Sequence, residues 1–134
     1  HMPQQVHEET DSYRIAYDDE IDAVVFTWKT FASGEQFREG SNAVLEYFEP
    51  KATSKLIVDT SGIEAHDDED QQWLEEVWTP NMIEAGLEYD AVVHPDSVIA
   101  SMDTEEIMTA LEKLPYEAFW TDDMSEAREW IAEK

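Results

Sequence analysis

The sequence predicts an α/β domain built on a five-stranded, mostly parallel sheet with an antiparallel first strand and four main helices. Three observations lead to this prediction. The 134 residues match the size of a single domain. Short segments with strand-like patterns alternate with longer segments that have helical spacing. Strands and helices that alternate in this way form right-handed crossovers between parallel strands.

Period-two patterns predict the first two strands. Residues 13–17 alternate apolar and polar side chains, and the acidic residues 18–20 form a turn. Because this turn is tight, the next strand, residues 23–30, should run antiparallel to the first. One face of that second strand carries Val24, Phe26 and Trp28.

Two helices flank the third strand. Ser33 followed by Gln36 predicts a capping box for a helix that ends at Pro50. Residues 55–59, Lys-Leu-Ile-Val-Asp, are typical of a buried parallel strand. The acidic residues 67–70 open the next helix, because negative charge favours a helix N-terminus. Within this helix Pro80 predicts a kink or a restart.

The last third of the chain repeats the alternation. Residues 89–94 and 118–121 are predicted as the fourth and fifth strands. Asp103 with Glu106 predicts the cap of the third helix, and Asp123 begins the final one.

We expect one domain over residues 12–134, since there is no internal repeat and no linker. Residues 1–11 are polar and are expected to be disordered. His1 ahead of Met2 looks like a remnant of an expression vector.

The charge is strongly negative: 33 acidic against 8 basic side chains, for a net charge of -25. This sign opposes direct binding to nucleic acid or to an anionic membrane. The acidic residues are dispersed along the chain, whereas a patch for a basic partner would form one block. We therefore expect an extreme halophile as the source, with cations bound nonspecifically at the surface.

The chain has no Cys, which excludes disulfides and thiolate chemistry. It has no apolar run of the roughly 18 residues that a membrane span needs, and its N-terminus lacks the apolar region of a signal peptide. We expect a cytoplasmic protein, and no motif implies a cofactor.

Several segments, together with the Trp28 strand, resemble the SpoIIAA-like (STAS) superfamily, and within it the small single-domain STAS/SEC14-like branch. These segments are residues 56–62, 72–80, 84–93 and 119–131. The resemblance implies a βα superhelix. It also implies a role in protein interaction or regulation, or the binding of an apolar ligand.

Signalling members of that superfamily switch partners by phosphorylating a Ser, and the resemblance places this position within residues 67–70. That stretch has no Ser or Thr, so the switch cannot be transferred to this chain. Glu69 could stand in for a phosphate, but it has less charge and fewer acceptor oxygens. An acidic first turn that stabilises the helix is the favoured interpretation.

Polar residues gather where ligands usually bind in such sheets, at the carboxyl ends of the third and fourth strands. Asp59, Ser61 and His94 are the residue types of a hydrolytic triad, but the G-x-S-x-G pattern is absent and Asp59 and Ser61 are also turn formers. His66 beside acidic neighbours could hold a divalent metal, although no metal-binding spacing is present. We therefore expect neither catalysis nor a specific metal site.

The aromatic residues are better candidates for lining a pocket or a contact surface. Trp73 and Trp78 lie five apart on a helix, so one of them should border a pocket or a contact surface. Phe119 and Trp120 are consecutive on a strand and should face opposite sides of the sheet. Ordinary core packing remains the simpler alternative for both pairs.

Our first expectation is a non-catalytic STAS-like interaction or regulatory domain that binds a protein partner or a second copy of itself. The alternative is a binder of a small apolar or lipid-like ligand, in a pocket between the sheet and the helix of residues 73–83. A hydrolase is the least favoured function. The candidate ligand or partner surface comprises Asp59, Ser61, His66, Glu69, Trp73, Trp78, His94 and Trp120.

The dispersed negative charge predicts that folding depends on salt. At about 1 M salt the Debye length is about 3 Å, so repulsion between carboxylates is screened. Circular dichroism across a salt series should show native structure at molar salt and its loss in dilute buffer. Full native structure in millimolar salt would contradict the assignment to a halophile.

Overall fold

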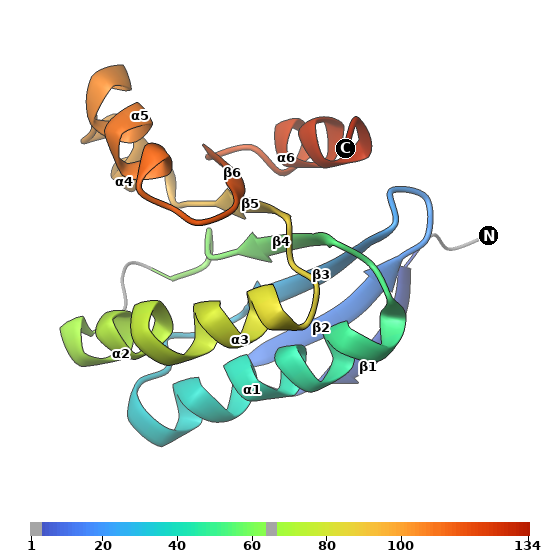
Figure 1. Cartoon of the computed structure of the whole chain (residues 1–134). Coiled ribbons are helices and arrows are strands. Elements are labelled where there is room, and N and C mark those ends of the chain that lie inside the picture. Colours follow the sequence, from blue (N-terminus) through green and yellow to red (C-terminus); the bar gives the residue numbers. More distant parts are fainter. Residues whose placement is uncertain (1–3, 64–66) are drawn as a thin grey trace.

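The structure, a computed structural model, describes residues 4–63 and 67–134 and has a six-stranded sheet (Figure 1). The strand order in the sheet follows the chain, from β1 to β6. The first two strand pairs are antiparallel and the other three are parallel. The strands are β1 Gln4–Glu9, β2 Tyr13–Asp18, β3 Ala23–Trp28, β4 Lys55–Asp59, β5 Tyr89–Val93 and β6 Glu117–Thr121.

The α/β class and the mostly parallel sheet are confirmed, but the prediction of five strands is wrong. The additional strand is β1, which lies in the segment expected to be disordered. Its sequence, Gln-Gln-Val-His-Glu-Glu, has no apolar alternation, and most of its side chains are exposed. An edge strand can be held by backbone pairing, here from Gln4 opposite Asp18 to Glu9 opposite Arg14.

The four main helices of the prediction are present, and a short helix, α4, is added. The second main helix is continuous from α2 through a π-helical stretch, η1, to α3, so the predicted interruption takes a π-helical form directly before Pro80. Proline has no N–H for the usual helical hydrogen bond. The helices are α1 Gly34–Lys51, α2 Asp68–Trp73, η1 Leu74–Trp78, α3 Thr79–Glu84, α4 Asp96–Ala100, α5 Thr104–Glu112 and α6 Met124–Ala132.

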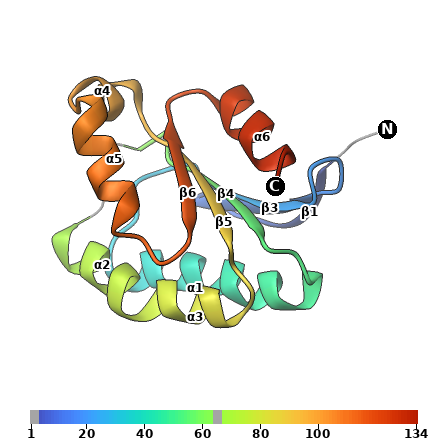
Figure 2. The same cartoon turned by 45° about the horizontal axis from the view of Figure 1, so that its top comes forward.

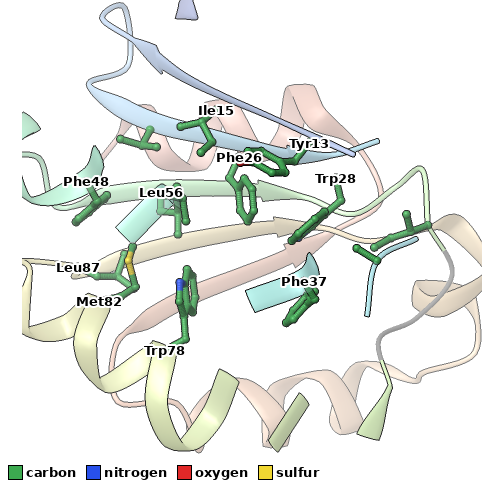
Figure 3. Close-up of a cluster of buried hydrophobic side chains, with 14 residues drawn as sticks. Tyr13, Ile15, Phe26, Trp28, Phe37, Phe48, Leu56, Trp78, Met82 and Leu87 are labelled. Carbon is green, nitrogen blue, oxygen red and sulfur yellow. The ribbon is translucent and has the colours of Figure 1, made fainter. Parts of the chain in front are cut away.

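Helices cover the two faces of the sheet unequally (Figures 1 and 2). On one face α1 and α3 pack against β2, β3 and β4 and bury the larger apolar cluster. Figure 3 shows this cluster, in which Trp28 stacks on Phe37 with ring centroids 5.3 Å apart. On the opposite face α6 buries a smaller cluster that includes Ile57, Ala91 and Ile131.

The start of α1 is capped differently from the prediction. Ser33 makes no side-chain cap hydrogen bond, and the side chain of Gln36 donates to Ser12 Oγ at 2.8 Å. The N–H of Gly34 instead donates to both carboxylate oxygens of Asp70, at 3.1 and 3.0 Å. Asp70 is 2% exposed, so a buried carboxylate from α2 stabilises the positive end of α1. The capping box of Asp103 with Glu106 and the cap at Asp123 are confirmed.

Gly40 allows α1 to lie close to the sheet. A Cβ atom at this position would lie 2.7 Å from Cη2 of Trp28 and 3.0 Å from the ring of Tyr13. Both rings are buried, so neither can swing into solvent. The close approach of α1 to β2 and β3 therefore requires a residue without a side chain.

We expect Gly40→Ala to lower the free energy of unfolding. Helix propensity alone favours Ala by about 1 kcal/mol, but forcing a methyl group into a packed core typically costs about 1–3 kcal/mol. Urea unfolding at constant high salt measures the balance. Asn42→Ala, at an exposed position of the same helix, is the control and should leave stability unchanged or raise it. Equal stability of Gly40→Ala and the wild type would show that α1 can move away from Trp28.

Candidate functional site

A cavity of about 870 Å³ lies between the sheet and two groups of helices. Its floor is formed by side chains of β4, β5 and β6, one wall by α2 and η1, and the other wall by α4, α5 and the segment that follows. Figure 1 shows these two helix groups apart from one another, with β5 and β6 between them. The apolar lining includes Phe26, Trp28, Val58, Ile63, Leu74, Trp78, Val92, Val98, Ala110, Leu114 and Trp120.

The cavity exists because the second wall is packed loosely. In the described chain, α4 and α5 are the helices that bury no residue, although α5 carries apolar side chains such as Ile107 and Leu111. Val58 and Val92 belong to inner strands and would be fully buried under a close helix, yet both are only half-buried. Leu56, on the same face of β4 as Val58, is 0% exposed. The same sheet is therefore closed at one end and hollow at the other.

Asp90 is the ionisable residue buried most deeply among the described residues of the cavity lining. The register pairs Asp90 with Leu56 and Val92 with Val58, so Asp90 and Val92 lie on the cavity face of β5. Asp90 is 3% exposed, and its Oδ1 has no hydrogen-bond partner among the described residues. Its carboxyl group is hydrogen-bonded to the side chain of Tyr116.

Burial shifts the ionisation of this pair. Loss of solvation raises the pKa of Asp90 to about 7, and the hydrogen bond from Tyr116 opposes part of that rise. Burial, followed by the neighbouring Asp90 charge, raises the pKa of Tyr116, which stays protonated as a donor. The cavity therefore holds a carboxyl group that changes charge near neutral pH.

His94 and Trp120 lie together in the lining, as two of the predicted site residues. Their rings meet edge to face, with centroids 5.0 Å apart. The N–H of His94 donates to the carbonyl oxygen of Thr121 at 2.8 Å, which fixes the end of β5 against β6. Phe119, the neighbour of Trp120, stacks on Trp130 of α6 with centroids 5.5 Å apart. The prediction that Phe119 and Trp120 face opposite sides of the sheet is confirmed.

Asp59 and Ser61 do not form a triad with His94. The hydroxyl of Ser61 donates to Oδ1 of Asp59 at 2.6 Å, and the backbone N–H of Ser61 donates to the same oxygen at 2.9 Å. Asp59 is paired with Val93, so it shares a sheet face with Val93 and not with His94. In a catalytic triad the histidine lies between the serine and the carboxylate. The two residues form a polar turn instead.

Trp73 and Trp78 both contact α1, and one of them borders a pocket, as predicted. The ring of Trp73 meets Phe37 edge-on, with centroids 6.2 Å apart, and Nε1 of Trp78 donates to the carbonyl oxygen of Ser41 at 2.7 Å. In a π-helical turn, hydrogen bonds join residues five apart, which brings the two indoles to the same side. Trp78 lines the cavity, while Trp73 is half-buried beneath the guanidinium of Arg38.

Of the predicted site residues, three line this cavity, Trp78, His94 and Trp120, whereas Asp59, Ser61, Glu69 and Trp73 do not. His66 lies outside the described residues. Glu69 is exposed in the first turn of α2, beside a shallow hollow that Arg38 and Asp70 also line. Among the described side chains, no group of three or more His, Asp or Glu residues is placed to hold a metal ion. Over the same ranges, no helix has the length and apolar character needed to cross a bilayer.

Asp90 and Tyr116 were not among the predicted site residues. The signal for Asp90 was present, since an acidic residue follows Tyr89 inside an otherwise apolar strand, two positions before Val92 and four before His94. Period-two alternation alone places these three side chains on one face. Tyr116 had no such signal, because it precedes β6 in a loop.

Comparison with known proteins yields no assignment. No family model matches the chain, and no curated protein matches it either.

We expect Asp90→Asn to change how stability depends on pH. A raised pKa means that the folded state binds the proton more tightly than the unfolded state. This contribution to stability is fully present below pH 3.8 and is lost as the pH rises through about 7. Between about pH 5 and about pH 8, the wild type should lose on the order of 2–4 kcal/mol relative to Asp90→Asn.

Chemical unfolding of both proteins at the two pH values measures this difference. All other carboxyl groups are common to both proteins, so their titration cancels in the comparison. Asp59→Asn, at a half-buried position on the opposite sheet face, is the control and should follow the wild type. A constant stability difference between wild type and Asp90→Asn would show that Asp90 titrates normally.

Proposed function

We propose that this chain is a non-catalytic binding domain that holds a small, largely apolar molecule in the cavity between the sheet and α5. The observation that supports this proposal best is the cavity itself. Its volume of about 870 Å³ lies within the roughly 300–1,000 Å³ of typical ligand pockets. Aromatic and aliphatic side chains dominate the lining, and a few polar groups, including Asp90, Tyr116 and His94, converge on it.

The proposal includes membership of the STAS/SEC14-like group of the SpoIIAA-like superfamily. Strand order that follows the chain, with the connections between parallel strands on one sheet face, agrees with a βα superhelix. The cavity also lies beside the helix that contains Trp78, where the sequence analysis expected a pocket. The dispersed acidic surface supports a halophilic source.

A domain that acts only by protein contact has less support. The large hydrophobic side chains that are exposed lie on four different elements, namely β1, the loop before α1, η1 and α5, and not in one patch. They are Val6, Phe31, Val77 and Met108. A regulatory role is compatible with ligand binding, because a ligand that fills the cavity would hold α4 and α5 against the sheet.

We expect the wild type to bind naphthalenemethanol, an uncharged aromatic probe, and Val92→Phe to bind it at least about tenfold more weakly. The larger ring would occupy the floor of the cavity at a position with free space beside it. Quenching of tryptophan fluorescence reports binding, because Trp28, Trp78 and Trp120 line the cavity. The titration is run at about 1 M salt to screen the surface charge.

Val77→Phe provides the matched control. It introduces the same ring at an exposed position of η1 that does not line the cavity. Thermal melts verify that both variants are folded. If the wild type does not bind the probe, or if Val92→Phe binds it as tightly as Val77→Phe, the cavity is not a ligand site.

A further inference from the structure

We infer that the ligand of this cavity carries a protonated amine, and that Asp90 binds the ammonium group as an ion pair while the apolar lining holds the rest of the molecule. This inference rests on the proposed function and specifies its ligand class. Its basis is a buried acceptor atom that receives no hydrogen bond from the described residues.

Oδ1 of Asp90 is a buried polar atom, and such an atom needs a hydrogen-bond partner. Asp90 is 3% exposed, and the described residues offer Oδ1 no hydrogen bond. A buried polar atom without a partner costs about 1–3 kcal/mol, and more if it is charged. Tyr116 already holds the carboxyl group in place. A donor on a ligand would remove this cost, so the site is prepared for an N–H or O–H group.

The charges around the cavity favour a cationic donor. Lys113 is the sole Lys or Arg among the described residues of the lining, and it is exposed at the rim. Asp68 and Glu75, on α2 and η1, line the cavity from the opposite wall and are exposed. The net charge of -25 adds an attractive field for any cation that approaches. A carboxylate ligand, such as a fatty acid, would meet Asp90 as a like charge.

The aromatic side chains that line the cavity also favour a cationic ligand. The side chains of Phe26, Trp28, Trp78 and Trp120 line the cavity. An ammonium group over an aromatic face gains about 0.5–2 kcal/mol, most for tryptophan. Aliphatic walls would provide no such gain. Rings around a single buried acid are therefore suited to an aromatic or aliphatic amine.

This assignment makes binding depend on pH in a definite direction. The titratable groups that face Asp90 or line the cavity are Tyr116, His94, Lys113, Asp68 and Glu75. Tyr116 stays protonated, while a proton on His94 would oppose an ammonium ligand. Because ionised Asp90 is the binding form, and its pKa is about 7, amine affinity should rise with pH through neutrality. Below that pKa, binding should release a proton.

The experiment compares three probes of one size: naphthylmethylamine, naphthalenemethanol and naphthoate. Each is titrated into the full chain by calorimetry at about 1 M salt and about pH 8, where nonspecific attraction is screened and Asp90 is ionised. We expect the amine to bind at least about tenfold more tightly than the alcohol, and naphthoate to bind most weakly. In Asp90→Asn the ratio of amine to alcohol affinity should fall to about one. Asp59→Asn, on the opposite face of the sheet, should retain the wild-type ratio.

A second measurement uses the wild type alone and remains informative if Asp90→Asn does not fold. Calorimetry at about pH 6 in buffers of different ionisation enthalpy should detect proton release with the amine and none with the alcohol. If the alcohol binds and the amine binds no more tightly, the inference is overturned and the proposed function stands. If the amine is preferred without proton release, its site is not Asp90 and the inference also fails. If none of the probes binds, the proposed function itself fails.

Discussion

The three connections between the parallel strands all cross the same face of the sheet, and this constraint determines the rest of the molecule. That face must be covered by α1, by the helix from α2 to α3, and by the pair α4 and α5, whereas α6 alone covers the other. Close packing of α1 is achieved through Gly40 and the stacked rings of Trp28 and Phe37. The helices of the last connection, α4 and α5, bury too little apolar surface to pack as closely over β5 and β6. A cavity at that end is the direct result.

Three aspartates are buried in this acidic chain, and each is accommodated differently. Asp18 is fully buried and forms an ion pair with Arg128 of α6. Asp70 receives the N–H of Gly34 through both oxygens. Asp90 has neither a cation nor a backbone donor, and burial raises its pKa towards neutrality. The first two have clear structural roles that join distant elements. Asp90 alone retains an unused acceptor atom, and it does so in a cavity.

Local pattern was sufficient to predict most of the fold and little of the site. Alternation located residues 13–17, and a short apolar run located residues 55–59, because a side-chain period is a property of consecutive residues. It could not predict β1, which is held by backbone pairing with β2. Nor could it predict that Asp70 caps Gly34 across 36 residues, since the partners meet only in the folded state. The cavity is a packing defect between helices, which no periodicity encodes. Asp90 was within reach of the pattern, because it shares a face with Val92.

The strand order also has a consequence for how the chain reaches this structure. Each strand pairs with the one made just before it, so most of the sheet can grow in the direction of synthesis without waiting for distant segments. The two antiparallel pairs are local in the chain, whereas each parallel pair must first close a connection that contains a helix, and such non-local pairing is slower. The ion pair of Asp18 and Arg128 spans 110 residues, and α6 also packs on Ile21 and Val25. The carboxylate of Asp18 gains its cation only when α6 has been synthesised and packs against the sheet. Docking of α6 therefore pairs the buried charge of Asp18 and, in the same step, covers the second face of the sheet.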